Sequence, residues 1–323
     1  MQRTLASLSL ALIALAACDP AHKPKPTVPA ELAWAYPQGP KGPSLDAGAG
    51  PFRLPGSSTT YTKAQLYDDS HMVDWYPQDH PPAPAAVATG VNGSIPCASC
   101  HMANGAGFLA APDIAGLPAP YIVEQVRAFR DDNRQSSRQG WGATQEMIST
   151  ARKVDDPALV LAAAYYSGLP RTQRYKVVET DMVPATTPDK YGWHDPVPGG
   201  RPEKIDGRII EVPEDLQRIL LIDDHARILV YVPRDSIASG QALVRSGGPS
   251  GLPCTSCHGS DLRGTGGTPP LAGRSAAYLT RQLWDIETGA RGGPSVALMQ
   301  SVATNLKPGQ IRDIAAYLAS RDP

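Results

Sequence analysis

Two short runs, Cys97-Ala98-Ser99-Cys100-His101 and Cys254-Thr255-Ser256-Cys257-His258, repeat one pattern of two cysteines followed by a histidine. This C-x-x-C-H pattern is the attachment sequence of a c-type haem. The spacing suits that chemistry, because thiols about one helical turn apart can bond two porphyrin vinyl groups while the histidine binds the iron. One match in a chain of this length could be half of a zinc site or a redox dithiol. Two matches favour two covalently bound haem c groups, attached at Cys97, Cys100, Cys254 and Cys257.

The sequence around the two runs is also duplicated. A glycine and then a tyrosine follow each motif histidine at the same two offsets, and later a methionine precedes another tyrosine at one shared interval. Between the first tyrosine and the methionine, the first copy is slightly longer than the second. The chain therefore contains an internal repeat, which predicts two domains of one kind. The paired positions are Gly116 and Gly273, Tyr121 and Tyr278, Met147 and Met299, and Tyr165 and Tyr317.

Each copy resembles a class I cytochrome c domain, and the pair resembles the diheme class I cytochromes of bacteria. The resemblance rests on the haem motif, a Pro-x-x-x-Gly run at 112–116 and 269–273, a helix opened by a tyrosine, a later methionine, and a last helix containing Ala-Ala-Tyr. It implies a mainly α fold with two tandem cytochrome c domains, residues 81–170 and 235–323, and it covers a little over half of the chain.

The histidines of the two motifs, His101 and His258, are expected to be the proximal iron ligands. A ligating histidine needs its other ring nitrogen hydrogen-bonded, because that bond fixes the tautomer and raises the basicity of the ligand. In the class I pattern a proline carbonyl accepts this bond. Pro112 and Pro269 follow their histidines at the same offset, and they are the expected acceptors.

The sixth iron ligand is expected to be a methionine in each domain. Met147 and Met299 share one repeat position, and a thioether suits a low-spin haem iron. The alternative is that they fill gaps in the core. Met102 adjoins His101 and cannot reach the opposite face of the ring, and Met72 and Met182 have no counterpart in the other copy. With both irons saturated, no position is open for a substrate, so no catalytic residue is expected.

The beginning of the chain is typical of an exported bacterial lipoprotein. Residues 1–17 hold Arg3 and then an almost wholly apolar run, which is short for a transmembrane helix and predicts a signal peptide. Leu15-Ala16-Ala17-Cys18 resembles a lipobox, which implies a lipid on Cys18 and an anchor on the periplasmic side of a membrane. The alternative is an ordinary signal peptide with a cysteine nearby. The remaining four of the five cysteines serve two haems, which leaves none for a disulfide.

Residues 18–80 are expected to form a lipid-anchor tether and a strap. They are rich in proline, glycine and small polar residues, which favours a flexible or extended tether at the start. From Trp34 the segment gains aromatic residues, which pure disorder rarely carries, so a strap over a haem domain is predicted. His71 and His80 within it are expected at the surface.

Residues 171–234 are expected to form a linker with a β-hairpin. The runs 208–212, 216–222 and 227–232 alternate as β-strands do, and Asp223-Asp224-His225 predicts the turn between the last two. A hairpin alone is marginally stable, so it should pack on a haem domain or pair with a third strand.

Charge and ligand pattern together predict an electron-transfer protein. A formal net charge of −1 gives no basic excess for nucleic acid. We expect electrons to pass from a dehydrogenase or a quinol-oxidising donor to a terminal acceptor, both of them redox partner proteins. The alternative is a cytochrome subunit of a membrane-bound dehydrogenase or oxidase complex. A diheme enzyme is disfavoured, because it needs an open iron or a different sixth ligand.

Overall fold

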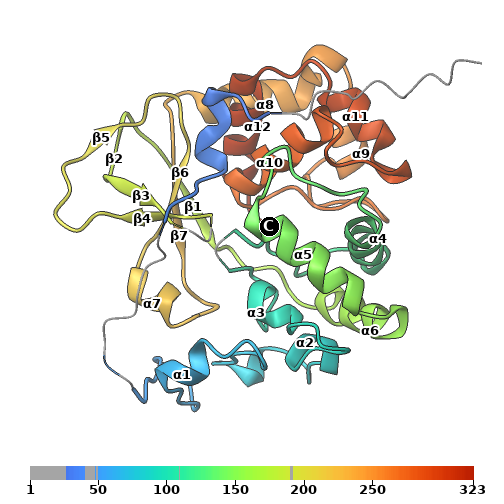
Figure 1. Ribbon diagram of the computed structural model, residues 1–323. Coiled ribbons are helices and arrows are strands. Elements are labelled where there is room, and N and C mark those ends of the chain that lie inside the picture. The colour runs from blue at the N-terminus through green and yellow to red at the C-terminus, as the bar shows by residue number, and fades with distance from the viewer. Residues whose placement is uncertain (1–26, 41–47, 49, 109, 190–191) are drawn as a thin grey trace, which may run out of the picture.

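The two sequence repeats fold into two groups of helices, with small β-sheets beside them (Figure 1). The predicted mainly α fold is therefore confirmed. Among the described helices, none has the length and apolar character that a membrane span requires. The predicted signal peptide and Cys18 lie outside the described residues. The computed structural model describes residues 27–40, 48, 50–108, 110–189 and 192–323.

The first repeat builds its helices around the haem motif. Helix α6 begins after Asp155, whose carboxylate accepts a hydrogen bond from the backbone N–H of Ala158 at 2.9 Å and so caps the first turn. Tyr166 of α6 and Ile122 of α4 share one buried cluster, and Cys97 packs against it. The motif helix is thus held by the core of its own repeat. The helices are α2 (Ala85–Ala88), α3 (Cys97–His101), α4 (Ala119–Arg130), α5 (Gly142–Lys153) and α6 (Asp156–Ser167).

The second repeat depends on a close crossing of its first and last helices. Gly240 of α8 permits this crossing, because a Cβ atom there would lie 1.9 Å from the carbonyl oxygen of Asp313 on α12. Ser275 caps α10, and its hydroxyl accepts a hydrogen bond from the Tyr278 N–H at 3.0 Å. The elements are α8 (Ser236–Ser246), η3 (Gly248–Ser250), α9 (Thr255–His258), α10 (Ala276–Glu287), η4 (Pro294–Val296), α11 (Ala297–Ala303) and α12 (Pro308–Ala319).

The linker between the repeats holds a three-stranded sheet of order β1-β7-β6, in which β1 is parallel and β6 antiparallel to β7. Strands β6 and β7 overlap two of the three predicted runs, but the predicted hairpin of 216–222 with 227–232 is wrong, because 216–222 is not a strand and β7 pairs with β6 instead. Leu216–Leu220 is helix α7, capped by Asp215, whose carboxylate accepts from the Gln217 N–H at 2.9 Å. The apolar residues 216, 219 and 220 have helical spacing, which explains the difference. The strands are β1 (Tyr175–Glu179), β2 (Met182–Val183), β3 (Thr186–Pro188), β4 (His194–Pro196), β5 (Glu203–Lys204), β6 (Ile210–Pro213) and β7 (Ile228–Val232).

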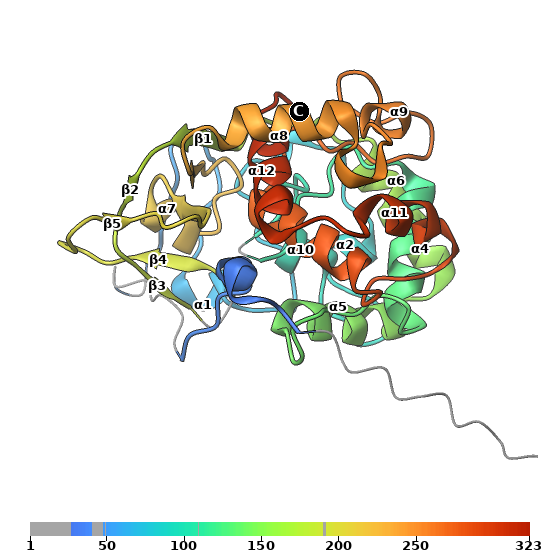
Figure 2. The same cartoon turned by 90° about the horizontal axis from the view of Figure 1, so that it is seen from above.

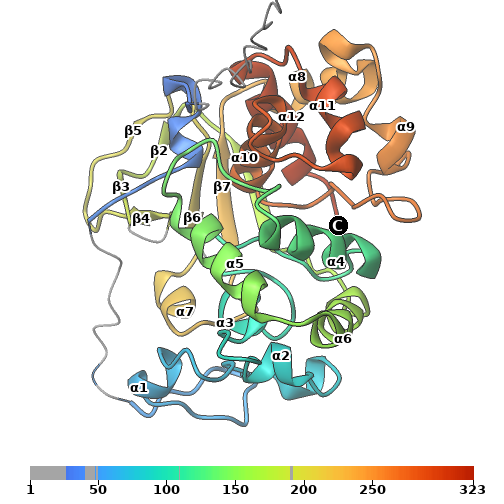
Figure 3. The same ribbon diagram turned by 45° about the vertical axis from the view of Figure 1, so that its right-hand side comes forward.

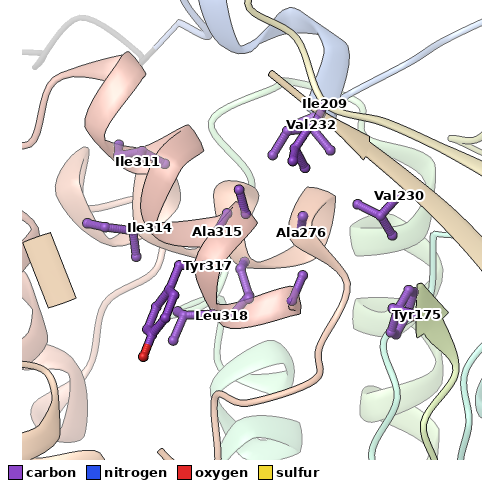
Figure 4. Packing of buried hydrophobic residues seen from close by; sticks show 14 of the residues in the cluster. Tyr175, Ile209, Val230, Val232, Ala276, Ile311, Ile314, Ala315, Tyr317 and Leu318 are labelled. Carbon is purple, nitrogen blue, oxygen red and sulfur yellow. The ribbon is translucent and has the colours of Figure 1, made fainter. Parts of the chain in front are cut away.

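The three-stranded sheet packs on the second repeat. Val230 and Val232 of β7 lie in the same buried cluster as Ile311 and Leu318 of α12 (Figure 4). Glu211 of β6 is also buried, and its carboxylate accepts from the Ser275 hydroxyl at 2.8 Å, at the start of α10. Sheet and helices therefore share both an apolar core and a helix cap.

The N-terminal strap contacts the second repeat first and the linker afterwards. The short helix η1 (Ala30–Ala35) lies beside the small sheets and α10 (Figure 2). Tyr36 donates a hydrogen bond to the Asp285 carboxylate at 3.1 Å, and the Arg281 guanidinium donates to the Ala35 carbonyl at 2.8 Å. Farther on, α1 (Lys63–Leu66) lies near α7 (Figure 3), and Trp75 donates to the Leu221 carbonyl at 2.7 Å.

His80 follows helix η2 (Pro77–Asp79). The sequence predicts a surface position for it, and this prediction is wrong. Its side chain is 3% exposed, and its Nε2 atom lies 3.3 Å from an Asp74 carboxylate oxygen. Its ring meets the edge of Tyr165 on α6 with centroids 6.0 Å apart. The His80 side chain of the strap therefore packs against α6 of the first repeat. His71 remains partly exposed beside Asp68.

Candidate haem sites

Both C-x-x-C-H runs form a short helix, so the two cysteines and the histidine of each motif lie within about one turn. Each helix ends in a residue with positive φ, which is Met102 (φ 62°) in the first repeat and Gly259 (φ 86°) in the second. Glycine adopts this conformation freely, whereas a buried methionine is strained in it. The surrounding structure therefore fixes the turn after His101.

The structure places each motif histidine next to the proline nominated from the sequence. The Nδ1 atom of His101 lies 2.9 Å from the Pro112 carbonyl oxygen, and that of His258 lies 2.8 Å from the Pro269 carbonyl oxygen. Burial lowers the pKa of both imidazoles. A neutral ring that donates from Nδ1 leaves Nε2 with a lone pair for a metal. Nε2 of His258 is buried and has no hydrogen-bond partner among the described residues.

A cavity opens beside the first motif. Cys97, Cys100 and His101 line it from α3, and Met147 lines it from α5. The structure thus brings the expected thioether cysteines and both expected iron ligands around one space. Its remaining wall is mostly apolar, which suits the face of a porphyrin. This wall includes Ile114, Leu117, Ile122, Phe129, Trp141 and Tyr166.

In the second repeat, Met299 lies on α11, in the stretch between the two long helices α10 and α12. Met299 and Cys254 both pack against the hydrophobic cluster that contains α10 and α12. Cys254 directly precedes α9, and Cys257 lies within it at the surface. The expected attachment and ligand residues of this repeat therefore border one core.

The repeats meet at a pair of arginines that sequence analysis did not assign. Arg134 is 8% exposed and donates to the side-chain carbonyl of Gln125 in its own repeat at 2.8 Å. It also crosses to the second repeat, where it donates to the Tyr278 hydroxyl at 3.1 Å and the side-chain carbonyl of Gln282 at 2.8 Å. One guanidinium thus ties α4 to α10.

Arg291 makes the same contacts in the opposite direction. It is 7% exposed and donates to Gln282 of its own repeat at 2.9 Å, and to Tyr121 and Gln125 of the first repeat at 2.9 and 2.8 Å. Arg134 and Arg291 follow the motif histidines of their repeats at the same offset. This shared offset is visible in the sequence, but the contacts of the two arginines across the repeats are not.

The arginine pair fits a group that carries negative charge. In the part of the chain that the structure describes, the hydrogen bonds of Arg134 and Arg291 go to neutral glutamine and tyrosine groups. Burial, followed by the nearby charge of Arg291, lowers the pKa of Arg134. Burial also acts to lower the pKa of Arg291, but Tyr121 and Tyr278 beside it outweigh that effect and raise it. A buried cation without an anion is costly. The cavity of the first motif extends to Arg134, and a haem carries two carboxylates, so these residues fit the group.

Both repeats match one family of known proteins. The family model of cytochrome c matches residues 95–178 and 237–322, one region in each repeat. The thiosulfate dehydrogenase electron acceptor of Thiomonas intermedia is 27% identical over 244 residues, which cover 74% of this chain and 84% of that protein. Cytochrome c4 of Pseudomonas aeruginosa is 38% identical over 87 residues, which cover 25% of this chain and 43% of that protein. The solved cytochrome c4 of Acidithiobacillus ferrooxidans is 22% identical, covering 69% of this chain and 98% of that one, with a TM-score of 0.45.

Proposed function

This chain belongs to the cytochrome c family as a diheme class I cytochrome with two covalently bound haem c groups, and from that premise we propose how its residues serve electron transfer. Cys97 and Cys100 hold one group, and the equivalent pair of the second repeat holds the other. When bound, a haem iron supplies one-electron redox chemistry. The protein then accepts single electrons from one partner and gives them to another.

In this proposal His101 and Met147 would hold the first iron, and His258 and Met299 would hold the second. The observation that carries it is the first cavity, which His101 and Met147 both line from different helices. Hydrogen bonds from Nδ1 to Pro112 and Pro269 orient the two histidines. Two protein ligands on each iron leave no position for a substrate, so the chain acts as a carrier.

Carbon monoxide tests this saturation. We expect the reduced, fully loaded protein to bind carbon monoxide slowly and in much less than one equivalent per haem, because a methionine must first leave. Absorption spectra after mixing give both the rate and the amount. Rapid binding of a full equivalent would show an open iron and would favour an enzyme instead.

We also propose that a thiosulfate dehydrogenase is the electron donor. The name of the Thiomonas intermedia relative supports this, since that relative aligns with 74% of the chain. Thiosulfate with a purified thiosulfate dehydrogenase should reduce the oxidised protein, followed by absorbance in a stopped-flow instrument. No reduction beyond the rate without dehydrogenase would contradict this donor. A complex that survives gel filtration would identify a permanent subunit rather than a mobile carrier.

The N-terminal sequence supports a location on the periplasmic side of a bacterial membrane. We propose that residues 1–17 are removed as a signal peptide and that Cys18 carries the lipid. Residues 18–80 then connect the anchor to the helical domains, whose limits we place at 81–170 and 235–323. The anchor would hold the carrier near membrane-bound partners, which raises its effective concentration there.

A further inference from the structure

Arg274 breaks the symmetry of the two repeats. It directly follows the Pro-x-x-x-Gly run of the second repeat, and the equivalent residue of the first repeat is Leu117. The side chain of Arg274 is 4% exposed. A buried guanidinium at a position that is apolar in the other repeat needs specific partners.

The partners of Arg274 are two loops at equivalent positions. Its Nε atom donates to the Pro270 carbonyl at 2.6 Å, and its Nη1 atom donates to the Asp113 carbonyl at 2.7 Å. Nη1 also donates to the Asp113 carboxylate at 2.8 Å. Asp113 and Pro270 follow the motif histidines of their repeats at the same offset. One side chain therefore bonds the same backbone position in both repeats.

Asp113 and Pro270 each directly follow the proline whose carbonyl accepts the hydrogen bond of a motif histidine. Pro112 accepts from His101 and precedes Asp113, while Pro269 accepts from His258 and precedes Pro270. The peptide group that contains each accepting carbonyl is rigid and ends at the Cα atom of the next residue, so a displacement of that residue moves the acceptor. The Arg274 guanidinium thus fixes the residue after each accepting proline, and through that residue it fixes the carbonyl that orients each histidine.

We propose that Arg274 is a positioning residue shared by both proximal histidines, so that it sets the two haem environments together. This inference rests on the proposed roles of His101 and His258 as iron ligands. A firm Nδ1–H bond makes the imidazole a stronger donor and so favours the oxidised iron. If both acceptor loops loosen, both reduction potentials rise.

Arg274→Lys is the informative variant. Lysine keeps the positive charge but lacks the planar fork, and it cannot bond Pro270 and Asp113 at once in the same way. We expect the midpoint potentials of both haems to rise relative to the unmodified protein. The hyperfine-shifted proton NMR signals of both proximal imidazoles should also move, because their hydrogen-bond acceptors shift while the positive charge at residue 274 is kept.

Arg171→Gln is the matched control. The Nη2 atom of Arg171 lies 3.6 Å from the same Asp113 carboxylate and donates to the Ala272 carbonyl at 2.6 Å, but it bonds neither Asp113 nor Pro270 through their backbone. Its loss removes a nearby positive charge and leaves both Arg274 contacts in place. A lost positive charge favours oxidised iron, so the potentials should stay or fall, the opposite sign from Arg274→Lys.

The measurements use the fully loaded protein, with potentials from spectroelectrochemical titration and spectra from NMR. A rise of both potentials together with shifts at both imidazoles supports the shared role. A change at one haem alone, or spectra of Arg274→Lys that equal those of the unmodified protein, would overturn it. If Arg274→Lys does not load haem, Asp113→Asn weakens the contact of Arg274 with the first loop only. A change at the first haem alone in Asp113→Asn then supports the positioning role, and no change at either haem overturns it. Rapid carbon monoxide binding by the unmodified protein would refute the saturated carrier separately.

Discussion

At the scale of the residue, the arginines between the repeats combine burial with bonds to both domains. Arg134→Lys keeps one charge but removes the fork that reaches Gln125, Tyr278 and Gln282. We expect the free energy of unfolding of the loaded protein to fall by about 1–3 kcal/mol, since buried partners lose their donor. Denaturant unfolding followed by haem absorbance measures this. Arg152→Lys, at an exposed pair with Asp132, should change it by less than about 0.5 kcal/mol.

The two methionines should act on one iron each. Met147→Ala is expected to turn the first iron largely high-spin and to lower its potential, because the thioether stabilises the reduced state. Met299→Ala should do the same to the second iron. Spectroelectrochemical titration of both variants, with carbon monoxide added to the reduced forms, separates the two sites. A low-spin spectrum that survives in either variant would assign the sixth ligand elsewhere.

Asp224 should make stability depend on pH. Burial raises its pKa to about 6, opposed by His225 and supported by Asp223. The folded protein therefore keeps this proton between about pH 4 and about pH 6, where the unfolded chain has lost it, so stability falls as pH rises through that window. Asparagine does not ionise, so Asp224→Asn removes this pH dependence. The free energy of unfolding of Asp224→Asn should exceed that of the unmodified protein by more at about pH 7.5 than at about pH 4.5. An advantage that is equal at both pH values would contradict this.

At the scale of the element, the crossing of α8 and α12 depends on one glycine. Gly240→Ala would gain about 1 kcal/mol of helix propensity, but its Cβ would lie 1.9 Å from the Asp313 carbonyl oxygen. Forcing two helix backbones apart costs more than that gain, about 1–3 kcal/mol or above, so the net effect is a loss. Thermal unfolding measures it.

Gly309 on α12 is the matched control for Gly240. A Cβ there would meet no atom within 4 Å, so Gly309→Ala should stabilise the protein by about 0.5–1 kcal/mol. Equal effects of the two substitutions would show that the crossing is not tightly packed.

Helices that are set by neighbouring residues, through motif spacing or a capping side chain, could be predicted from the sequence. Contacts between segments that are distant in the sequence could not. The motif helices and the helix after Ser275 follow from spacing and capping. The run 216–222 satisfied both a strand and a helix pattern, and the Asp215 cap decided for the helix. His80 is buried because the strap returns to Tyr165, which no local pattern records. In the candidate site, cysteines, histidines and acceptor prolines followed from the motif, whereas Arg134 and Arg291 act across the two repeats.

At the scale of the whole molecule, the proposed lipid anchor predicts where the protein is found. Cys18→Ser should leave the protein without an acyl group, so that washing membranes with buffer releases it, while the loaded haem spectrum stays the same. Fractionation and the mass of the N-terminal peptide measure this. A native N-terminal peptide without lipid mass would contradict the anchor.

The interface between the two repeats resembles the two-fold symmetric interface of a homodimer, although both halves belong to one chain. Arg134 and Arg291 exchange equivalent bonds, and the backbone repeats the exchange, since Gln135 donates to Ala290 at 2.8 Å and Gly292 donates to Asn133 at 2.8 Å. In a homodimer every substitution occurs twice, and both halves must change together. Here the covalent link lets one half change alone, as Arg274 opposite Leu117 already shows. A symmetric contact can therefore hold two haem domains that are free to differ in potential.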